Sequence, residues 1–444
     1  MKTAKARKGH SEAIRPMQAR PARAFPWPLL MLLVTVFQLL TFAPVLLRDE
    51  AQDLGLLLAL LCYIPGEWLF LLLLRAITKQ RRCELEVLGL WLSGIGLAVC
   101  GSFSPEFAWK QAAAVGGGLL VYAALLWMTA DPGRAMKLRP AVAVAAGALL
   151  AANLALGTVV GGQRNWITLG GFSIQPSELV KLAFVFVGAA TLDRLQRTQS
   201  ITRYLIFAMA CVAALFYMRD FGAALIFFLT FLLIAFLRSG DLRAIALVCA
   251  AALMAAALVL LFSDYVTNRF SVYRHVWEDP HGMGYQQTRV LIYSSSGGLF
   301  GLGLGNGRLR GVFAASTDLV FGLVCEELGM VVAFLVPLCY VVFAAHTLRG
   351  AKQARSSFYA IASVSAAGLL LIQASLNIFG ITDLLPLTGV TLPFLSRGGT
   401  SMLCSWGLLA FMKGGWAPSA AGQPLRAAAS PPVRSPASGS RGRS

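Results

Sequence analysis

The chain has 444 residues, of which 57% are hydrophobic and only 13% are charged, and its formal net charge is +18. Soluble domains carry about 25% charged residues, so this composition excludes an ordinary soluble domain and indicates a membrane protein. Nucleic-acid binding is disfavoured, because the basic residues lie in an N-terminal tail and in short segments between apolar runs. In such places they act as topology signals and contact anionic lipids.

Apolar runs long enough to cross the hydrocarbon core of a bilayer recur along the chain. Residues 1–25 form a basic tail, and residues 417–444 are rich in Pro, Ala, Ser and Arg, a composition that cannot build a core. Between them we expect one all-α polytopic transmembrane domain, residues 26–416, with about twelve helices. The expected spans are 27–47, 54–77, 85–105, 109–130, 139–160, 178–193, 204–218, 221–238, 242–263, 318–346, 357–379 and 398–413.

Twelve spans place both termini on the same side of the membrane, and the loop charges indicate which side. The five loops on the side of the termini contain fourteen Lys and Arg residues, whereas the five short loops on the other side contain only five. Positively charged residues are enriched in cytoplasmic loops. Both termini are therefore expected in the cytoplasm, and the long loop 264–317 is expected to face outward.

The first of four polar clusters on the expected outer side is residues 161–182. Arg164 and Trp166 precede a helix whose first turns contain Glu178 and Lys181. These two lie on one helix face, because they are three residues apart. The cluster is either a helix cap with a structural ion pair or part of a polar binding site.

The second cluster, Arg219 and Asp220, breaks a hydrophobic stretch between two short spans. Charges at membrane depth are costly and often mark functional sites. We expect the two side chains to pair with each other. The pair either closes a tight turn between the helices or faces a ligand.

The third cluster is residues 276–311, within the long loop 264–317. It contains the carboxylates Glu278 and Asp279, several aromatic and basic residues, and six glycines in the run 297–307. Glycine backbone can approach a ligand closely, and its N–H groups can surround anionic oxygens. A polar loop of this length is more often functional than not, so we expect a ligand site here.

The fourth cluster, residues 377–402, lies between the last two spans and combines Arg397 with several prolines and glycines. Irregular backbone beside the membrane indicates a re-entrant segment that lines a cavity. Carboxylates also occur inside spans, at Glu67 and at the pair Glu326 and Glu327. Each is expected to have a partner or to face a cavity rather than lipid.

Together the four clusters predict an outward site, rich in carboxylates and arginines, above a cavity in the membrane. Such a site suits an amphiphilic anionic substrate with a lipid tail. Arginine binds diphosphate oxygens in a bidentate manner, and a carboxylate can serve as general base or metal ligand. A transporter or a passive scaffold stays possible on these residues alone.

At these clusters the chain resembles the FtsW/RodA/SpoVE family of shape, elongation, division and sporulation proteins. The resemblance runs in family order from about residue 160 to 412, through short motifs that together make chance implausible. The residues that match family motifs are Arg164, Trp166, Gln175, Pro176, Ser177, Glu178, Lys181, Trp277, Asp279, Pro280, Gly282, Gly284, Tyr285, Gln286, residues 296–305, Thr317, Asp318, Phe321, residues 326–329, Gln373, Asn377, residues 385–389 and residues 392–401.

Several features depart from the family pattern. The family usually reads Gln-Pro-Asp-x-Gly where residues 218–222 keep Asp220 and the glycine but lack the proline. A Pro-Glu-x-His motif is missing from residues 312–316, and Arg397 stands where a tyrosine is usual. The family typically has ten spans, so the two extra spans are expected at the N-terminus and the family-like core at about residues 85–413.

The resemblance implies a peptidoglycan glycosyltransferase that joins lipid II disaccharide units with inversion, on the outer face of the bacterial cytoplasmic membrane. It implies that Asp279 is the catalytic carboxylate, which we expect to be a general base partly buried beside Trp277 and Tyr285. Arg164, Arg219 and Arg397 are expected to contact the diphosphate. The complete set of implied substrate-binding residues is Arg164, Trp166, Glu178, Lys181, Arg219, Asp220, Trp277, Tyr285, Gln286, Asp318, Ser396 and Arg397.

A divalent cation, magnesium or manganese, is expected to neutralise the leaving group, although no metal ligands can be named. The resemblance implies a class B penicillin-binding transpeptidase as partner. One alternative is a lipid II flippase, in which Glu67, Glu178 and Lys181 form a polar pathway. Another is a non-catalytic scaffold that activates a transpeptidase. The sequence does not distinguish division from elongation or sporulation.

Overall fold

The computed structural model describes residues 26–46, 53–79, 82–160, 162–169, 172–192, 198–240, 242–243, 246, 248–250 and 271–414. The long helices in these ranges are α1 (Trp27–Leu46), α2 (Asp53–Thr78), α3 (Glu84–Gly101), α4 (Pro105–Thr129), α5 (Pro132–Leu156), α6 (Pro176–Leu192), α7 (Thr198–Tyr217), α8 (Phe221–Ser239), α11 (Tyr285–Ser296), α13 (Gly329–Ala351), α14 (Ser357–Ile381) and α15 (Gly399–Gly414). Shorter elements are β1 (Thr158–Val160), β2 (Gln163–Leu169), β3 (Phe172–Ile174), η1 (Leu309–Gly311), α12 (Val320–Leu323) and η2 (Val324–Leu328).

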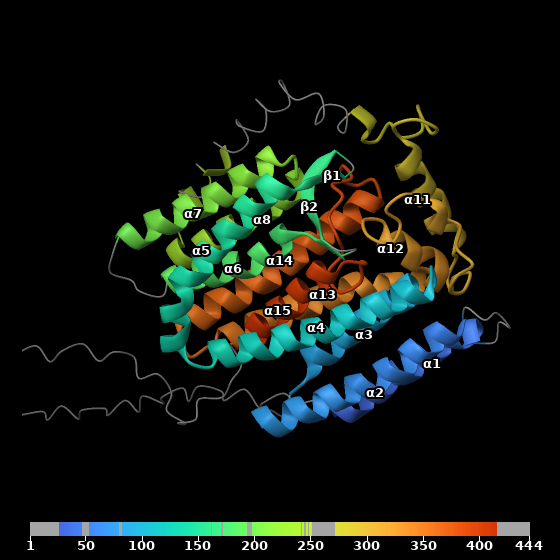
Figure 1. Ribbon diagram of the computed structural model, residues 1–444, viewed down its shortest axis with the longest axis horizontal. Coiled ribbons are helices and arrows are strands. Elements are labelled where there is room, and N and C mark those ends of the chain that lie inside the picture. The colour runs from blue at the N-terminus through green and yellow to red at the C-terminus, as the bar shows by residue number, and fades with distance from the viewer. Residues whose placement is uncertain are drawn as a thin grey trace, which may run out of the picture.

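The helices form an elongated bundle in which α14 and α15 lie in the middle, and α1 and α2 lie along one edge (Figure 1). Helix α15 packs against α4, α6 and α14, while α1 and α2 pack against α3 and α4. The indole of Trp406, on α15, is fully buried. Its ring meets those of Phe70 and Tyr122 edge-on, with centroid distances of 5.9 Å to each. Aromatic packing of this kind joins the N-terminal helices to the central ones.

Within the described residues, seven helices are long and apolar enough to cross a membrane. Large apolar side chains such as Leu40 and Phe334 point outward and are 69% and 71% exposed. Such faces suit contact with lipid, and a bundle of helices satisfies its backbone groups internally. The expected fold class, an all-α polytopic membrane protein, is therefore confirmed.

The expected spans correspond to helices wherever the structure describes the chain, whereas most of the span 242–263 lies outside the described residues. The total of twelve spans stays a prediction.

One predicted span ends too late. The helix expected over 139–160 is α5, which ends at Leu156, and residues 158–160 form strand β1 instead. Gly157 has an extended backbone (φ −62°, ψ 133°) that stops the helix, and β-branched residues follow it. Strand β1 pairs antiparallel with β2, which pairs with β3. The first polar cluster is therefore a small sheet followed by helix α6, rather than a loop.

The polar clusters that the sequence places on the outer side lie toward one end of the bundle. Strands β1 and β2 and helices α11 and α12 are all found there (Figure 1). The irregular segment 382–398, between α14 and α15, reaches the same end, because Tyr273 donates a hydrogen bond to the Leu384 carbonyl at 2.8 Å. This end of the bundle therefore carries parts of the first, third and fourth polar clusters.

The side of the membrane that this end faces can be tested by labelling. We expect a cysteine at Ser295, an exposed position at the end of α11, to react with an impermeant thiol reagent in intact cells. A cysteine at Ser200 should not react, since the charge asymmetry places it in the cytoplasm. The native cysteines are removed first. Labelling of Ser200→Cys without labelling of Ser295→Cys would invert the topology and move the site inside.

Candidate functional site

Segment 382–398 is contacted by the long outer loop 264–317, by the start of α8 and by strand β2. Its Arg397 amide donates to the Ser316 carbonyl at 2.8 Å. On another side, a methyl group added at Gly222, at the start of α8, would lie 3.1 Å from the Thr388 carbonyl oxygen. An alanine here would also meet the Val390 side chain at 2.6 Å, so glycine allows α8 and segment 382–398 to pack closely. We call segment 382–398 the floor segment.

Ser396 fixes the shape of this segment. Its hydroxyl accepts a hydrogen bond from the Leu392 amide at 2.7 Å and donates to the Thr317 carbonyl at 2.5 Å. The side chain is 2% exposed. These contacts give Ser396 a structural role, and a substrate would reach it only if these bonds opened.

Arg397, the next residue, is half-buried and has a different environment. Its guanidinium lies 4.0 Å from the centre of the Phe107 ring, at the start of α4. No described carboxylate lies within 4.0 Å of this guanidinium. Stacking on an aromatic face orients an arginine while its N–H donors stay available to an anion.

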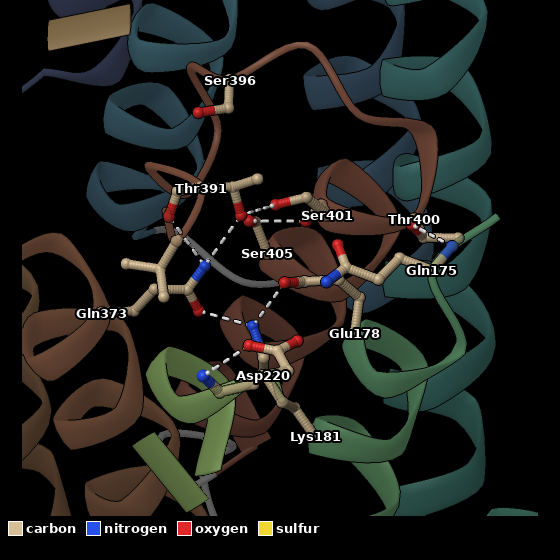
Figure 2. A network of polar contacts seen from close by, with 12 residues as sticks. Gln175, Glu178, Lys181, Asp220, Gln373, Thr391, Ser396, Thr400, Ser401 and Ser405 are labelled. Carbon is tan, nitrogen blue, oxygen red and sulfur yellow. Dashed lines mark hydrogen bonds and ion pairs between the residues drawn. The ribbon is translucent and has the colours of Figure 1, made fainter. Parts of the chain in front are cut away.

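Behind the floor lies a network of buried polar contacts (Figure 2). Lys181, 1% exposed, binds Glu178 at 2.6 Å and the Gln373 side-chain oxygen at 2.8 Å. The Gln373 amide donates to the carbonyl and hydroxyl oxygens of Thr391, and the Thr391 hydroxyl lies 2.9 Å from that of Ser401. The network therefore connects α6, α14, the floor and α15, which supports the structural interpretation of Glu178 and Lys181.

Arg219 and Asp220 do not pair with each other, so that expectation is wrong. Asp220 caps helix α8, because one carboxylate oxygen accepts the Ala223 amide at 3.0 Å and the other accepts the Asn165 side-chain amide at 2.9 Å. Both bonds turn the carboxylate inward, where it is 3% exposed. The Arg219 side chain points outward and is exposed. Its φ of 60° lies in the left-handed region, which is uncommon for residues other than glycine.

The two charges should therefore behave differently when they are replaced. Asp220→Ala should lower the free energy of unfolding by about 2–4 kcal/mol, since the helix cap is lost and the buried Asn165 amide keeps only its bond to the Gln163 side chain. Arg219→Ala should leave the melting temperature of the purified protein unchanged. Equal melting temperatures for the two variants would contradict this separation of roles.

Strand β2 brings a second arginine beside Arg219. The Arg164 amide donates to the Met218 carbonyl at 3.0 Å, and its side-chain Nε donates to the Gly157 carbonyl at 3.0 Å. The rest of the Arg164 side chain is exposed. Trp166, two residues further on the same strand, is half-buried. The structure therefore places Arg164 and Arg219 next to each other, as a binding role for both requires.

Polar groups without hydrogen-bond partners lie on strand β2 and on the floor segment. Asn165 is buried, and its side-chain oxygen has no hydrogen-bond partner among the described residues; the same holds for the Thr388 hydroxyl. A methyl group added at Gly389 would contact Asp318 at 3.4 Å and the Gln163 amide nitrogen at 4.0 Å. Buried polar groups without partners are costly and are often explained by a ligand or by water.

Asp279 lies on the turn that leads into α11. Its two carboxylate oxygens accept the Gly282 and Met283 amides, each at 2.9 Å. Contrary to the expected partial burial, Asp279 is exposed, and Trp277 and Tyr285 are 59% and 41% exposed. Backbone amides of the same turn hold the Asp279 carboxylate, and it does not pack against the core. The turn lies at the surface.

Further along α11, Gln286 donates to the Phe313 carbonyl at 3.0 Å. Its side chain thus holds the helix against the stretch that follows the glycine-rich run.

A family described as "Cell cycle protein", with FtsW, RodA and SpoVE as its members, matches residues 97–413. The chain belongs to this family. It is 34% identical over 257 residues to the stage V sporulation protein E of Bacillus subtilis, covering 56% of this chain and 69% of that protein. It is 32% identical over 269 residues to the peptidoglycan glycosyltransferase RodA of Mycobacterium tuberculosis, and spans 57% of that relative's length.

Solved structures show the same fold as this FtsW/RodA/SpoVE-family chain. A chain from a peptidoglycan synthase complex, described as coordinating polymerization and crosslinking, aligns with a TM-score of 0.63 and 25% identity. The alignment covers 74% of this chain and 95% of that chain. The rod shape determining protein RodA of Thermus thermophilus aligns with a TM-score of 0.56 and 24% identity, over 75% and 96% of the two chains.

Helices α1 and α2 precede the residues that match the family, as the sequence predicts for the two extra spans. Glu67, on α2, is 2% exposed and accepts both of its hydrogen bonds from the Gln38 amide on α1, at 3.0 and 3.1 Å. The expectation that Glu67 has a partner is therefore confirmed. Its partner Gln38 lies on α1, outside the residues that match the family.

Sequence analysis did not single out Asn165 or Thr388 as members of the site. Asn165 lies between the arginine and the tryptophan of a family motif, and Thr388 lies within another. Their position inside matched motifs is therefore the feature of the sequence that could have identified them. Their unpartnered atoms, which mark them as candidates, became visible only when the β2 strand and the floor segment were brought together.

Few of the described side chains around the floor segment could coordinate a metal ion. Among the described residues, no three His, Cys, Asp or Glu side chains come together closely enough to hold one. The oxygen groups beside the floor segment are the carboxylate of Asp318 and the unpartnered side-chain oxygen of Asn165, since both oxygens of the inward-facing Asp220 carboxylate already accept hydrogen bonds. Magnesium uses one or two carboxylates when phosphate oxygens supply further ligands. These residues fit a cation that a phosphate-bearing substrate brings with it, and not a resident metal cage.

Proposed function

We propose that this chain is a peptidoglycan glycosyltransferase that joins lipid II disaccharide units into glycan strands. Relatives named peptidoglycan glycosyltransferase, at 30–32% identity, support this activity. The observation that carries the proposal is that the long outer loop, the start of α8 and strand β2 all contact one floor segment at one end of an apolar bundle. A lipid-linked diphosphate needs such a place, since its tail stays in the membrane while its sugars lie outside.

The proposed reaction forms a glycosidic bond with inversion. Asp279 removes the proton from the acceptor sugar hydroxyl, and the resulting oxygen attacks the anomeric carbon of the donor. The bond from that carbon to the undecaprenyl diphosphate breaks, and the diphosphate leaves with the electron pair. The exposed position of Asp279 is suited to a reaction between two sugars outside the membrane.

Three arginines are proposed to hold the diphosphate. Arg164 and Arg219 are neighbours with exposed side chains, and Arg397 is held by the Phe107 ring. Guanidinium groups bind phosphate oxygens in pairs and keep their charge at all physiological pH values. A magnesium or manganese ion bound with the diphosphate would supply further positive charge, next to Asp318.

Aromatic and polar side chains are proposed to contact the sugars. Trp277 and Tyr285 flank the Asp279 turn with exposed rings, and Trp166 lies on the β2 strand. Aromatic faces pack well against the apolar faces of sugar rings. Gln286, held by the Phe313 carbonyl, would act through the position of α11 rather than by direct contact.

The proposed location is the bacterial cytoplasmic membrane, with both termini in the cytoplasm and the site outside. The proposed partner is a class B penicillin-binding transpeptidase that crosslinks the new strands. A similar solved chain comes from a complex described as coordinating polymerization and crosslinking, which supports a partner of this kind.

The flippase alternative loses its main support. It needs Glu67, Glu178 and Lys181 in one polar pathway, whereas Glu67 bonds to Gln38 and the other two bond to each other and to Gln373. Within the described residues, no hydrogen bond or ion pair joins these two groups of side chains.

Polymerisation of labelled lipid II by the purified protein tests the proposal. Glycan strands should form in detergent micelles or liposomes, with a transpeptidase partner present if the chain alone is inactive. No strand formation under either condition, together with stimulation of the partner's crosslinking, would establish the scaffold instead.

A further inference from the structure

Two buried carboxylates have no role in the site described so far. Glu326 and Glu327 lie on the π-helical turn η2, between α12 and α13, and are 0% and 1% exposed. π-Helical turns are rare and occur frequently at functional sites. A carboxylate buried in a transmembrane segment is costly unless its oxygens are bonded.

Glu326 is bonded by the two residues that directly follow the glycine-rich run. One of its carboxylate oxygens accepts the Arg308 amide at 2.7 Å, and the other accepts the Leu309 amide at 3.0 Å. The sequence predicts that backbone N–H groups of the run surround an anion. The structure shows instead that a carboxylate of the protein, Glu326, accepts the first two amides beyond the run in a bidentate arrangement.

The backbone of the turn binds the same run. Leu302 and Gly303 donate to the carbonyl oxygens of Glu326 and Glu327, at 2.9 and 3.0 Å. A methyl group added at Gly301 would lie 2.2 Å from the Glu327 carbonyl oxygen, so the contact requires glycine. The glycines in this run thus serve close packing on η2.

Glu327 connects the run to the α3–α4 turn. Ser102, directly after α3, donates to one Glu327 oxygen at 3.3 Å. Arg310 donates to the carbonyls of Ser102 and Gly305. The other Glu327 oxygen has no hydrogen-bond partner among the described residues. Glu327 therefore makes one side-chain bond where Glu326 makes two.

Helix α11 connects the glycine-rich run to the turn that carries Asp279. The helix runs from that turn to the glycine-rich run, and its fully buried Val290 packs on Gly322 of α12, one turn before η2. The turn carrying Asp279 is otherwise exposed. The attachment of the run at Glu326 is therefore one of the contacts that fix the outer loop on the bundle.

We propose that Glu326 is a positioning residue, whose carboxylate clamps the glycine-rich run onto η2 and thereby fixes Asp279 relative to the bound lipid diphosphate. The functional part of this proposal rests on the proposed polymerase activity. The clamp itself is a structural statement that can be tested without activity.

The test is hydrogen exchange of backbone amides, followed by mass spectrometry, on the full chain in micelles. Glu326→Gln turns one acceptor oxygen into a donor that faces a backbone N–H, so one of the two bonds is lost. Amides in residues 302–309 should exchange about 10- to 100-fold faster, as loss of a hydrogen bond to a charged group implies. In the lipid II assay, kcat should fall by a larger factor than KM changes, because substrate contacts are intact while the base is displaced.

Gly307→Ala is a second variant for the same clamp, in case Glu326→Gln fails to fold. Its new methyl group would lie 2.7 Å from a Glu326 oxygen and 2.9 Å from a Glu327 oxygen, so both carboxylates must shift while their charge is kept. It should produce the same local rise in exchange. Glu327→Gln should raise exchange at residues 308–309 less than Glu326→Gln. The exposed Glu106→Gln should change neither exchange nor rate.

Unchanged exchange of residues 302–309 in both Glu326→Gln and Gly307→Ala would overturn the clamp. Faster exchange with full polymerisation would overturn the positioning role. If the wild-type chain does not polymerise lipid II, the proposed function fails, and the exchange experiment still decides the clamp by itself.

Discussion

Replacing Asp279 by asparagine should lower the rate of glycan polymerisation by about 100- to 10,000-fold, the usual contribution of a positioned general base. The amide keeps the size of the side chain and removes its basicity. Asparagine also keeps only one of the two acceptors for the Gly282 and Met283 amides. Because the residue is exposed, the melting temperature should change little. The assay is strand formation from labelled lipid II by purified protein.

Two companion variants separate the chemistry from the turn. Glu278→Gln should keep most of the activity, since Glu278 is exposed, bonds only to His275 at 2.9 Å and is not fixed by the family motif. Gly282→Ala keeps the Asp279 carboxylate but would place a methyl group 2.1 Å from it, so the carboxylate must move. Its activity should fall as well. An Asp279→Asn protein with wild-type activity would remove Asp279 from the mechanism.

Replacing Lys181 by methionine should produce the largest loss of stability. The change leaves Glu178 charged and buried without its partner, and breaking a buried ion pair in this way costs about 3–5 kcal/mol. It also removes the donor to Gln373, so the floor segment loses a support. We expect a strongly lowered melting temperature and little protein in the membrane fraction.

The double variant Glu178→Gln, Lys181→Met should recover much of this loss, because no buried charge is left. Lys110→Met is the matched control, since its ion pair with Glu106 lies at the surface, and exposed pairs contribute little. If Lys181→Met is stable but inactive, the pair belongs to the substrate site, and the structural interpretation of the network is wrong.

Much of the fold could be predicted from composition and apolar runs. Helices such as α1, α8 and α14 begin and end within a few residues of the expected spans, because a bilayer requires apolar stretches of fixed length. The small sheet β1–β3 was missed. Its first strand follows directly on the apolar run of α5, with only Gly157 and the β-branched residues after it to mark the change, and its pairing partner Trp166 lies further along the chain.

Site residues were predictable where a short motif carries them, and their partners were not. The motifs place Asp220, Lys181 and Ser396 at the site, but sequence separation hides the contacts with Asn165, Gln373 and Thr317. The expected Arg219–Asp220 pair shows the same limit. The two neighbouring side chains point apart, because the Asp220 carboxylate accepts the backbone N–H of Ala223 at the start of α8.

The sequence by itself determined that this is a polytopic membrane protein of the FtsW/RodA/SpoVE family, with a basic, asymmetrically charged set of loops and its chemistry gathered in four segments. Apolar length, charge and motif order are local properties of the chain, so they can be seen without a structure. The tertiary structure alone decided that Asp220 caps a helix, that Glu326 accepts the amides that follow the glycine-rich run, and that Asp279 is exposed. A carboxylate binds whichever donors the fold brings to it, and long-range packing selects them.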